Sequence, residues 1–428
     1  MNRIRLTVLL ILVSLVLTAC SIQDVPVIGR LFGGGGGGVE TSKPVTLTVW
    51  GLWESPEVVQ ALINKYQELR PNVTINYDDR SILKIDDYKD RIFSSAGQTI
   101  EADVVMVHNS WVARLKETMV PMPSTVMDVG TYSSNFYPVA VTAGVHDNQI
   151  YAMPLYYDGL ALVYNKQHFD EVGQSEPPTA WEEFRSLALR LTVRAGADNT
   201  SNNVRSGAAI GTADNIDFFS DILGLMWTQA GVEIPGDLST RAAQDALTFY
   251  TNFVKEDKVW DGTMPEATTA FADGKVSMIF APTWIVNTIL EARPDLDVGV
   301  APIPQAVPDR PASWASFWMI AVPNTSQNSA VAWDFINFLG QEDQQLLRFN
   351  ESSNFRTIVT PYSLQTLNAD LTSNPYLRAY VTTAPFASGG VMSARSGNKL
   401  QVDLLKEAVN SVLKGDSAEA ALKKMLNQ

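Results

Sequence analysis

Several of the ten tryptophans in this 428-residue sequence stand where predicted β-strands end. They are Trp50 and Trp53 after a strand over 45–50, Trp111 after one over 102–107, and Trp284 after one over 276–281. Ligands of open α/β sheets bind beyond the carboxyl ends of the strands. An indole offers a flat apolar face and one N–H donor, which suits the C–H face of a sugar ring whose hydroxyls bind Asp, Glu or Asn. The pattern favours recognition of a sugar, although any single tryptophan could equally fill the core, as Trp181 in a predicted helix stripe does.

Motifs of common catalytic and metal sites are missing from the sequence. The three histidines, His108, His146 and His168, have no metal-binding spacing, and neither a GxSxG elbow nor a Walker loop occurs. The SxxK pattern occurs without the accompanying KTG. The sequence therefore predicts no enzyme, no metal and no cofactor. An anchored glycosidase stays open, because it needs only two carboxylates across a cleft and acidic residues are plentiful.

The elements that position these residues alternate between strands and helices. Apolar runs over 45–50, 73–77, 102–107 and 160–164 predict strands, and amphipathic stretches over 57–69, 181–191 and 239–255 predict helices. This alternation predicts an α/β fold with largely parallel sheets. A chain of 428 residues exceeds the usual size of one hydrophobic core, so two domains are expected.

The N-terminus has the pattern of an exported protein. Arg3 and Arg5 precede an apolar segment that is too short to span a membrane, so residues 1–19 are predicted to be a signal peptide. The sequence LTAC that ends at Cys20 resembles the lipobox of bacterial lipoproteins, and Cys20 is the single cysteine. Lipidation of Cys20 is therefore expected. Residues 20–44, which include a run of six glycines over 33–38, are predicted to be a flexible tether.

The chain is acidic, with 46 Asp and Glu against 32 Lys and Arg. The formal net charge of −14 repels polyanions. Nucleic acid is therefore not an expected partner, and phosphate or sulfate is disfavoured as a ligand.

Four ordered segments resemble one family. They are YAMPLYYDGLALVYNKQHFDEVG with the following PPTAWEEF, AFADGKVSMIFAPTW, AVAWDFINFLGQEDQQ and VNSVLKGDSAEAALKKM. Together they resemble the extracellular solute-binding proteins of ATP-driven (ABC-type) importers, in the carbohydrate-binding branch that includes maltose-binding protein. The resemblance runs from about residue 45 to the C-terminus.

The resemblance implies a two-lobed periplasmic-binding-protein-like fold with a hinge that the chain crosses three times. The crossings are expected near 155–156, 301–303 and 350–356. Lobe one would then comprise 45–155 and 303–350, and lobe two would comprise 156–302 and 351–428.

The resemblance also implies a ligand-binding site between the lobes. The residues expected there are Trp50, Glu54, His108, Asn109, Ser110, Tyr157, Asp158, Trp284, Trp314 and Arg395. The last stacking aromatic residue of maltose-binding protein has no counterpart, because Arg395 and Ser396 stand in that region. Arg395 can bind hydroxyls or a carboxylate bidentately, or form a surface salt bridge, and both interpretations stay open.

The resulting prediction is a lipid-anchored, monomeric receptor on the outer side of the cytoplasmic membrane, in the periplasm or at the cell surface. It would capture a sugar or oligosaccharide between two closing lobes and deliver it to a membrane permease. Two alternatives stay open: the same scaffold with a peptide, polyamine or polyol, and the glycosidase.

Overall fold

The computed structural model describes residues 43–93, 100–196 and 203–427. The predicted signal peptide, Cys20 and the glycine run lie outside these residues. Within the described part of the chain, none of the helices has the length and apolarity needed to cross a membrane.

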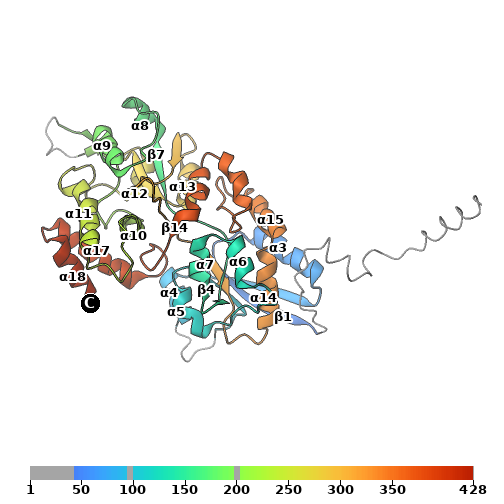
Figure 1. Ribbon diagram of the computed structural model, residues 1–428. Helices are drawn as coiled ribbons and strands as arrows, with labels where there is room; N and C mark the ends of the chain where they lie inside the picture. The colour runs from blue at the N-terminus through green and yellow to red at the C-terminus, as the bar shows by residue number, and fades with distance from the viewer. Residues whose placement is uncertain (1–42, 94–99, 197–202, 428) are drawn as a thin grey trace, which may run out of the picture. The chain divides into compact units, whose positions relative to one another are not determined.

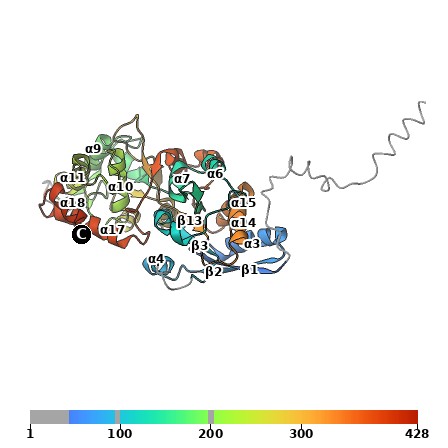
Figure 2. The same ribbon diagram turned by 60° about the horizontal axis from the view of Figure 1, so that its bottom comes forward.

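Lobe one is built on a sheet of five strands in the order β2-β1-β3-β13-β6 (Figure 2). Their bounds are β1 Val45–Gly51, β2 Val73–Asp79, β3 Val104–His108, β6 Met153–Pro154 and β13 Trp318–Ala321. Strand β1 pairs in parallel with β2 and β3, whereas β13 runs antiparallel to β3 and β6. The helices of this lobe are α3 Pro56–Leu69, α4 Ile85–Phe93, α5 Val112–Leu115, η2 Lys116–Thr118, α6 Val129–Asn135, α7 Pro138–Gly144, α14 Ser329–Leu339 and α15 Glu342–Ser352.

Helix α3 shows how the sequence fixes an element beside the cavity. The Ser55 side chain caps the helix by accepting a hydrogen bond from the Val58 N–H, and Pro56 occupies the first turn, where its missing N–H costs nothing. Buried Val58, Leu62, Ile63 and Tyr66 form its inner face. At its C-terminal end, the hydroxyl of Tyr66 donates to Asp334 of α14 at 2.9 Å. Helices α3, α14 and α15 therefore pack as one group (Figure 1).

Lobe two contains a three-stranded sheet, in which β7 Ala161–Asn165 lies between β10 Met278–Ala281 and β11 Val298–Ala301. Both pairings are antiparallel. The two-lobed α/β fold is thus confirmed, but the expectation of a largely parallel sheet was wrong for this lobe. Helix α13, Thr283–Ala292, joins β10 to β11 as a crossover between strands of equal direction, and β7 lies between them in the opposite direction.

The helices around this sheet include the predicted helix over 181–191 and the one that begins near Ser239. They are α8 Lys166–Glu171, α9 Trp181–Leu191, α10 Phe219–Gln229, α11 Arg241–Lys255, α12 Ala267–Ala272, α17 Lys399–Leu413 and α18 Ala418–Leu426. Helices α10, α11, α17 and α18 pack against one another (Figure 1). The remaining short elements are β4 Val145–His146, β5 Gln149–Ile150, β8 Val193–Arg194, β9 Asn203–Arg205, β12 Ser313–Trp314, η3 Leu367–Ser373, α16 Arg378–Thr383, η4 Ala384–Phe386 and β14 Ala387–Ser388.

Three chain segments run between the lobes. Residues 155–160 leave the lobe-one sheet after β6 and enter β7, and they pair with the other two segments at Gly159–Ala315 and Tyr156–Tyr362. The segments that hold Ala315 and Tyr362 are therefore the second and third connections, and the crossings expected at 155–156 and 350–356 stay predictions. The second lies later than 301–303, because residues 303–314 bond lobe two: Gln305 pairs with Thr179, and the Trp314 indole donates to Asp221 of α10. The segment 303–314, expected in lobe one, thus belongs with lobe two.

Candidate ligand-binding site

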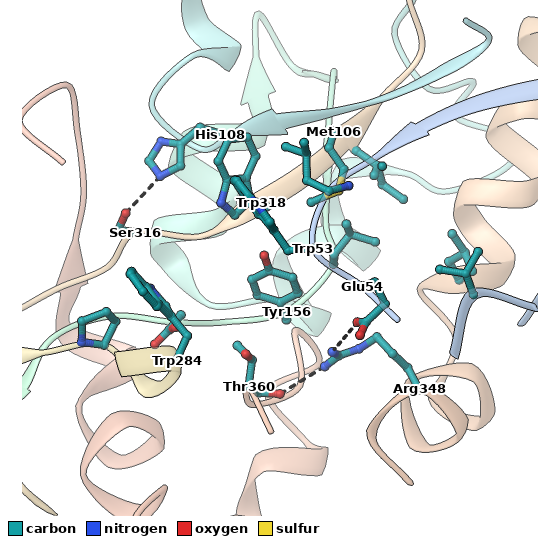
Figure 3. Close-up of a pocket in the computed structure, with 18 of the residues that line it drawn as sticks. Trp53, Glu54, Met106, His108, Tyr156, Trp284, Ser316, Trp318, Arg348 and Thr360 are labelled. Carbon is teal, nitrogen blue, oxygen red and sulfur yellow. Dashed lines mark hydrogen bonds and ion pairs between the residues drawn. The ribbon is translucent and has the colours of Figure 1, made fainter. Parts of the chain in front are cut away.

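A cavity of about 710 Å³ lies between the lobes. It is lined by the loop after β1, the carboxyl end of β3, the hinge segment over 155–160 and the first turn of α13 (Figure 3). The carboxyl ends of strands thus meet the N-terminus of a helix at this cavity. Ligands of α/β proteins usually bind at such places.

Two indoles are presented to this cavity, one from each lobe. Trp53 and Trp284 are 44% and 41% exposed, and the other eight tryptophans, all within the described residues, are at most 8% exposed. Trp53 has a left-handed backbone (φ 56°), which is uncommon for a bulky residue. Its N–H donates to the Ser81 hydroxyl at 2.6 Å, and its ring packs edge-on against Trp318 at 5.0 Å. These contacts hold an apolar ring open to solvent.

Trp284 is held in place by lobe two. It is the second residue of α13, and its ring packs edge-on against Phe218 at 5.9 Å. The Arg395 guanidinium lies 5.6 Å from the centre of the indole, and it pairs with Asp217. The two interpretations of Arg395 therefore meet: it forms an ion pair, and it also lines the cavity with a side chain that is 55% exposed.

Glu54 lies between two arginines at the lobe-one wall. Its carboxylate lies 3.6 Å from an Arg348 nitrogen and 3.5 Å from an Arg356 nitrogen. Figure 3 shows the Arg348 guanidinium facing Glu54, and it also donates to the Thr360 carbonyl at 3.1 Å. Burial lowers the pKa of Arg348, while the charge of Glu54 opposes this effect. Glu54, Arg348 and Arg356 together carry a positive formal charge. Their contacts link α15 to the third hinge segment.

His108 ends β3 inside the cavity wall. Its ring nitrogens bond the hydroxyls of Ser110 at 2.8 Å and Ser316 at 3.0 Å. Burial, with a smaller contribution from the charge of Lys89, lowers the pKa of His108 to about 3. The imidazole is therefore neutral at physiological pH and acts as a hydrogen-bonding group, without a charge.

Two buried carboxylates complete the wall. Asp158 accepts hydrogen bonds from the backbone of Gly159 at 2.8 Å and from Thr283 through its N–H at 3.0 Å and its hydroxyl at 2.8 Å. Asp221 accepts from the Trp314 indole at 2.9 Å and the Ala394 N–H at 2.7 Å. Burial raises the pKa of each to about 7, although these hydrogen bonds oppose the shift. Asp158 therefore holds the start of α13 against the hinge, and Asp221 holds Trp314 and the loop at Ala394 against α10.

A loop over 393–398 bridges the two lobes beside the cavity. The Lys89 ammonium of α4 donates to the Gly397 carbonyl at 2.7 Å and to Asn398 Oδ1 at 2.8 Å. The Trp111 indole donates to the Ser396 carbonyl at 2.8 Å, and the Asn398 amide donates to the Ser110 hydroxyl at 2.8 Å. These bonds hold the lobes together next to Arg395.

Half of the residues predicted for the site line this cavity. They are Glu54, His108, Asp158, Trp284 and Arg395. The other five are Trp50, Asn109, Ser110, Tyr157 and Trp314, and the structure places them behind the cavity wall or in the core.

The contacts of these five explain their positions. Trp50 points to the opposite face of the sheet, where Arg80 lies 4.5 Å from its ring centre. Asn109 accepts from the Phe317 N–H at 3.3 Å, and Tyr157 packs on Tyr137 at 5.0 Å. Ser110 bonds His108 and Asn398, and Trp314 is 1% exposed.

Most cavity residues were not among the predicted site residues, and Trp53, Arg348 and Arg356 are among those missed. Side chains alternate along a strand, and Gly51 lines the cavity, so Trp50 must point away. That alternation, applied to β1, would have favoured Trp53 in the loop. Nothing in the local sequence indicates that Arg348 and Arg356 line a site. They contact Glu54 only because the folded chain brings distant segments together.

Among residues 43–93, 100–196 and 203–427, no group of three or more His, Cys, Asp or Glu side chains could hold a metal ion.

Two α/β lobes, three connecting segments and a cavity between them define the class of two-lobed binding proteins.

The chain belongs to the bacterial extracellular solute-binding protein family, whose model matches residues 61–379. This confirms the family predicted from the four segments. A binding protein of Brucella abortus is 23% identical over 369 residues, covering 83% of this chain and 87% of the relative. The maltotriose-binding protein of Pyrococcus abyssi is 22% identical over 292 residues, covering 66% and 59%. An ABC transporter solute-binding protein of Thermotoga lettingae, solved with α-D-tagatose, has a TM-score of 0.68 at 21% identity, covering 90% and 98%.

Proposed function

We propose that this protein is a receptor that captures a sugar or oligosaccharide between its lobes and delivers it to an ABC permease. The observation that carries the proposal is the pair of exposed indoles, Trp53 from lobe one and Trp284 from lobe two, on one cavity. An indole offers a flat apolar face, which suits the apolar C–H face of a sugar ring. Relatives that are named for maltotriose or solved with tagatose add support.

Polar groups around the indoles are available to sugar hydroxyls. The Asn287 amide nitrogen has no hydrogen-bond partner among the described residues, while its oxygen accepts from the Ile358 N–H at 2.9 Å. The Gln344 side chain also lines the cavity without a partner there. Together with Arg356 and Arg395, these groups offer donors in several directions.

The proposal is of a binding protein without catalysis. A glycosidase needs one carboxylic acid and one carboxylate that can reach the scissile bond. The three carboxylates on the cavity are each engaged: Glu54 by two arginines, Asp158 by Gly159 and Thr283, and Asp221 by Trp314 and Ala394. These contacts favour a receptor over the glycosidase alternative.

Charge separates the alternative ligands. Arg348, Arg356 and Arg395 line the cavity together with Glu54, Asp158 and Asp221, so the wall carries no excess of negative charge that would attract a polyamine. Neutral sugars, polyols and peptides need no such excess. Closure of the lobes around the ligand follows if the ligand contacts both at once, because only a difference in affinity shifts such an equilibrium. One chain supplies both walls, and we propose that it acts as a monomer.

A thermal-shift panel tests the proposal. Maltotriose, tagatose and other sugars are compared with sorbitol, spermidine and a tripeptide on the protein without its N-terminal 42 residues. A ligand at 100 times its dissociation constant stabilises the folded form by about 2.7 kcal/mol. We expect at least one sugar to raise the melting temperature saturably. A shift with sorbitol, spermidine or the peptide and with none of the sugars would contradict the proposal.

We further propose that the protein is exported, acylated at Cys20 and held at the outer face of the cytoplasmic membrane. The sequence LTAC and the solitary cysteine support this location. Replacing Cys20 with serine is expected to move the protein from the membrane fraction to the soluble fraction, because the thiol that carries the lipid is lost. Sugar binding by the released protein should match the wild type. Retention of the variant in the membrane fraction would contradict lipid anchoring.

A further inference from the structure

The cavity does not end at the cleft between the lobes. It continues along one face of the lobe-one sheet, beneath α3 and α14. Its deep walls are aliphatic or aromatic side chains from both layers: Val49, Leu62, Ile75, Val104, Ile320 and Phe335. We call this extension the sheet-face channel.

The strand register places the residues that line the channel on neighbouring strands. Val49 pairs with Tyr77 and Val104, and Ile320 pairs with Met106, so the lining residues sit side by side on neighbouring strands. His108 and Val104 lie on the same face of β3, with His108 at the cleft and Val104 deep inside. At about 3.3 Å per residue, four residues of strand span roughly 13 Å. The lining thus extends toward the interior of lobe one, where Val49, Ile75 and Leu62 are 7%, 8% and 9% exposed and Val104 is fully buried.

The entrance of the channel lies where polar and apolar walls meet. A Cβ on Gly51 would stand 2.1 Å from the Tyr77 hydroxyl, so the phenol lies directly over this glycine. Glycine inside a strand often marks such a close approach. Glu54 and Trp53 follow on the cleft side, whereas Val49 and Ile75 follow on the deep side.

Protein cores are normally close-packed, and an apolar space larger than a water molecule is uncommon. Water gains nothing in such a space, because it needs two to four polar partners. An apolar group gains the contacts that the aliphatic walls leave unmade. The chemistry of the channel therefore selects a hydrocarbon group, and its continuity with the cleft makes that group part of the same ligand.

We propose that the natural ligand is a glycoside with an apolar aglycone, whose alkyl or aryl group fills the sheet-face channel. The inference rests on the proposed function, since the sugar portion lies between Trp53 and Trp284. In this proposal, lobe one selects the ligand by the length of the hydrocarbon group of its aglycone.

The test compares n-octyl β-D-glucoside with methyl β-D-glucoside by isothermal titration calorimetry, below the micelle concentration of the octyl compound. Each buried methylene contributes roughly fourfold to affinity. We expect the octyl compound to bind at least about tenfold more tightly, as two buried methylenes suffice for this. Leu62→Phe, which fills the channel from α3, should remove the difference. Leu69→Phe on the same helix, at a 59% exposed position outside the cavity, should preserve it.

Each outcome decides the inference. Equal affinity for the two glucosides, no saturable octyl binding, or an octyl preference that survives Leu62→Phe would overturn it. If Leu62→Phe fails to fold, Val59→Phe, at a partly exposed channel position, replaces it. Failure of the sugar proposal has a different signature: the octyl compound binds through the channel, while no free sugar stabilises the protein and Trp284→Ala leaves the octyl affinity unchanged.

Discussion

Replacing Trp284 with alanine is expected to lower the affinity for the best sugar of the panel by roughly ten- to a thousandfold. An aromatic contact contributes about 0.5–1.5 kcal/mol beyond its buried area, and burial of the ring itself adds about 1.5–3 kcal/mol. Because the indole is 41% exposed in the ligand-free protein, its loss opens no cavity in the core. Stability should change by about 1 kcal/mol or less. Calorimetric titration and thermal unfolding of one variant measure both quantities.

Trp284→Phe is the matched control, because it keeps an aromatic face of smaller area and loses the indole N–H. We expect an affinity between those of the wild type and the alanine variant. If Trp284→Ala unfolds readily while its folded fraction binds sugar normally, the indole supports the fold and is not a sugar platform. The site would then have to be sought at Trp53 and the arginines.

The α/β fold could be predicted because it depends on short-range patterns. Apolar runs of strand length and helical stripes such as the one in α3 are local, and hydrophobic burial fixes them. The direction of β7 could not be read in this way. A strand that pairs antiparallel with both neighbours has the same buried, apolar composition as a parallel one, and only the path of the chain through α13 decides between them.

The site could be predicted only where the residue type and its place in the sequence indicate that a side chain is exposed. Trp284 comes two residues after the proline that follows a strand, and it lines the cavity. Trp50 has the same residue type and a similar position, but side-chain alternation turns it to the other face of the sheet. Arg348 lies in the amphipathic helix α15 and looks like a solvent-facing residue. Its burial against Glu54 arises because α15 packs on α3, which only the tertiary structure shows.

Trp314 gives the sharpest contrast with Trp284, since both were predicted to contact the ligand. Trp314 is 1% exposed, and its ring lies directly over Gly224 of α10, where a Cβ would stand 2.7 Å from the indole. Trp314→Ala is therefore expected to cost roughly 3–5 kcal/mol of unfolding free energy, as large-to-small changes in cores do. Differential scanning calorimetry of this variant beside Trp284→Ala measures the difference. If Trp314→Ala keeps its stability and loses sugar affinity, Trp314 is a ligand contact after all.

Trp314→Phe separates the indole N–H from the volume of the ring. Burial raises the pKa of Asp221 from an ordinary value of 3.8 to about 7, and the hydrogen bond from Trp314 opposes that shift. The folded protein therefore holds a proton that the unfolded chain has already lost, and stability falls as the pH rises from about 4 to about 7. Without the indole donor the folded-state pKa rises further, so the loss of stability continues above pH 7. The smaller ring costs stability at both pH values, so we expect the melting temperature of Trp314→Phe to lie below that of the wild type at pH 5 and further below it at pH 8.5. An equal difference at both pH values would show that the indole N–H does not stabilise the Asp221 carboxylate.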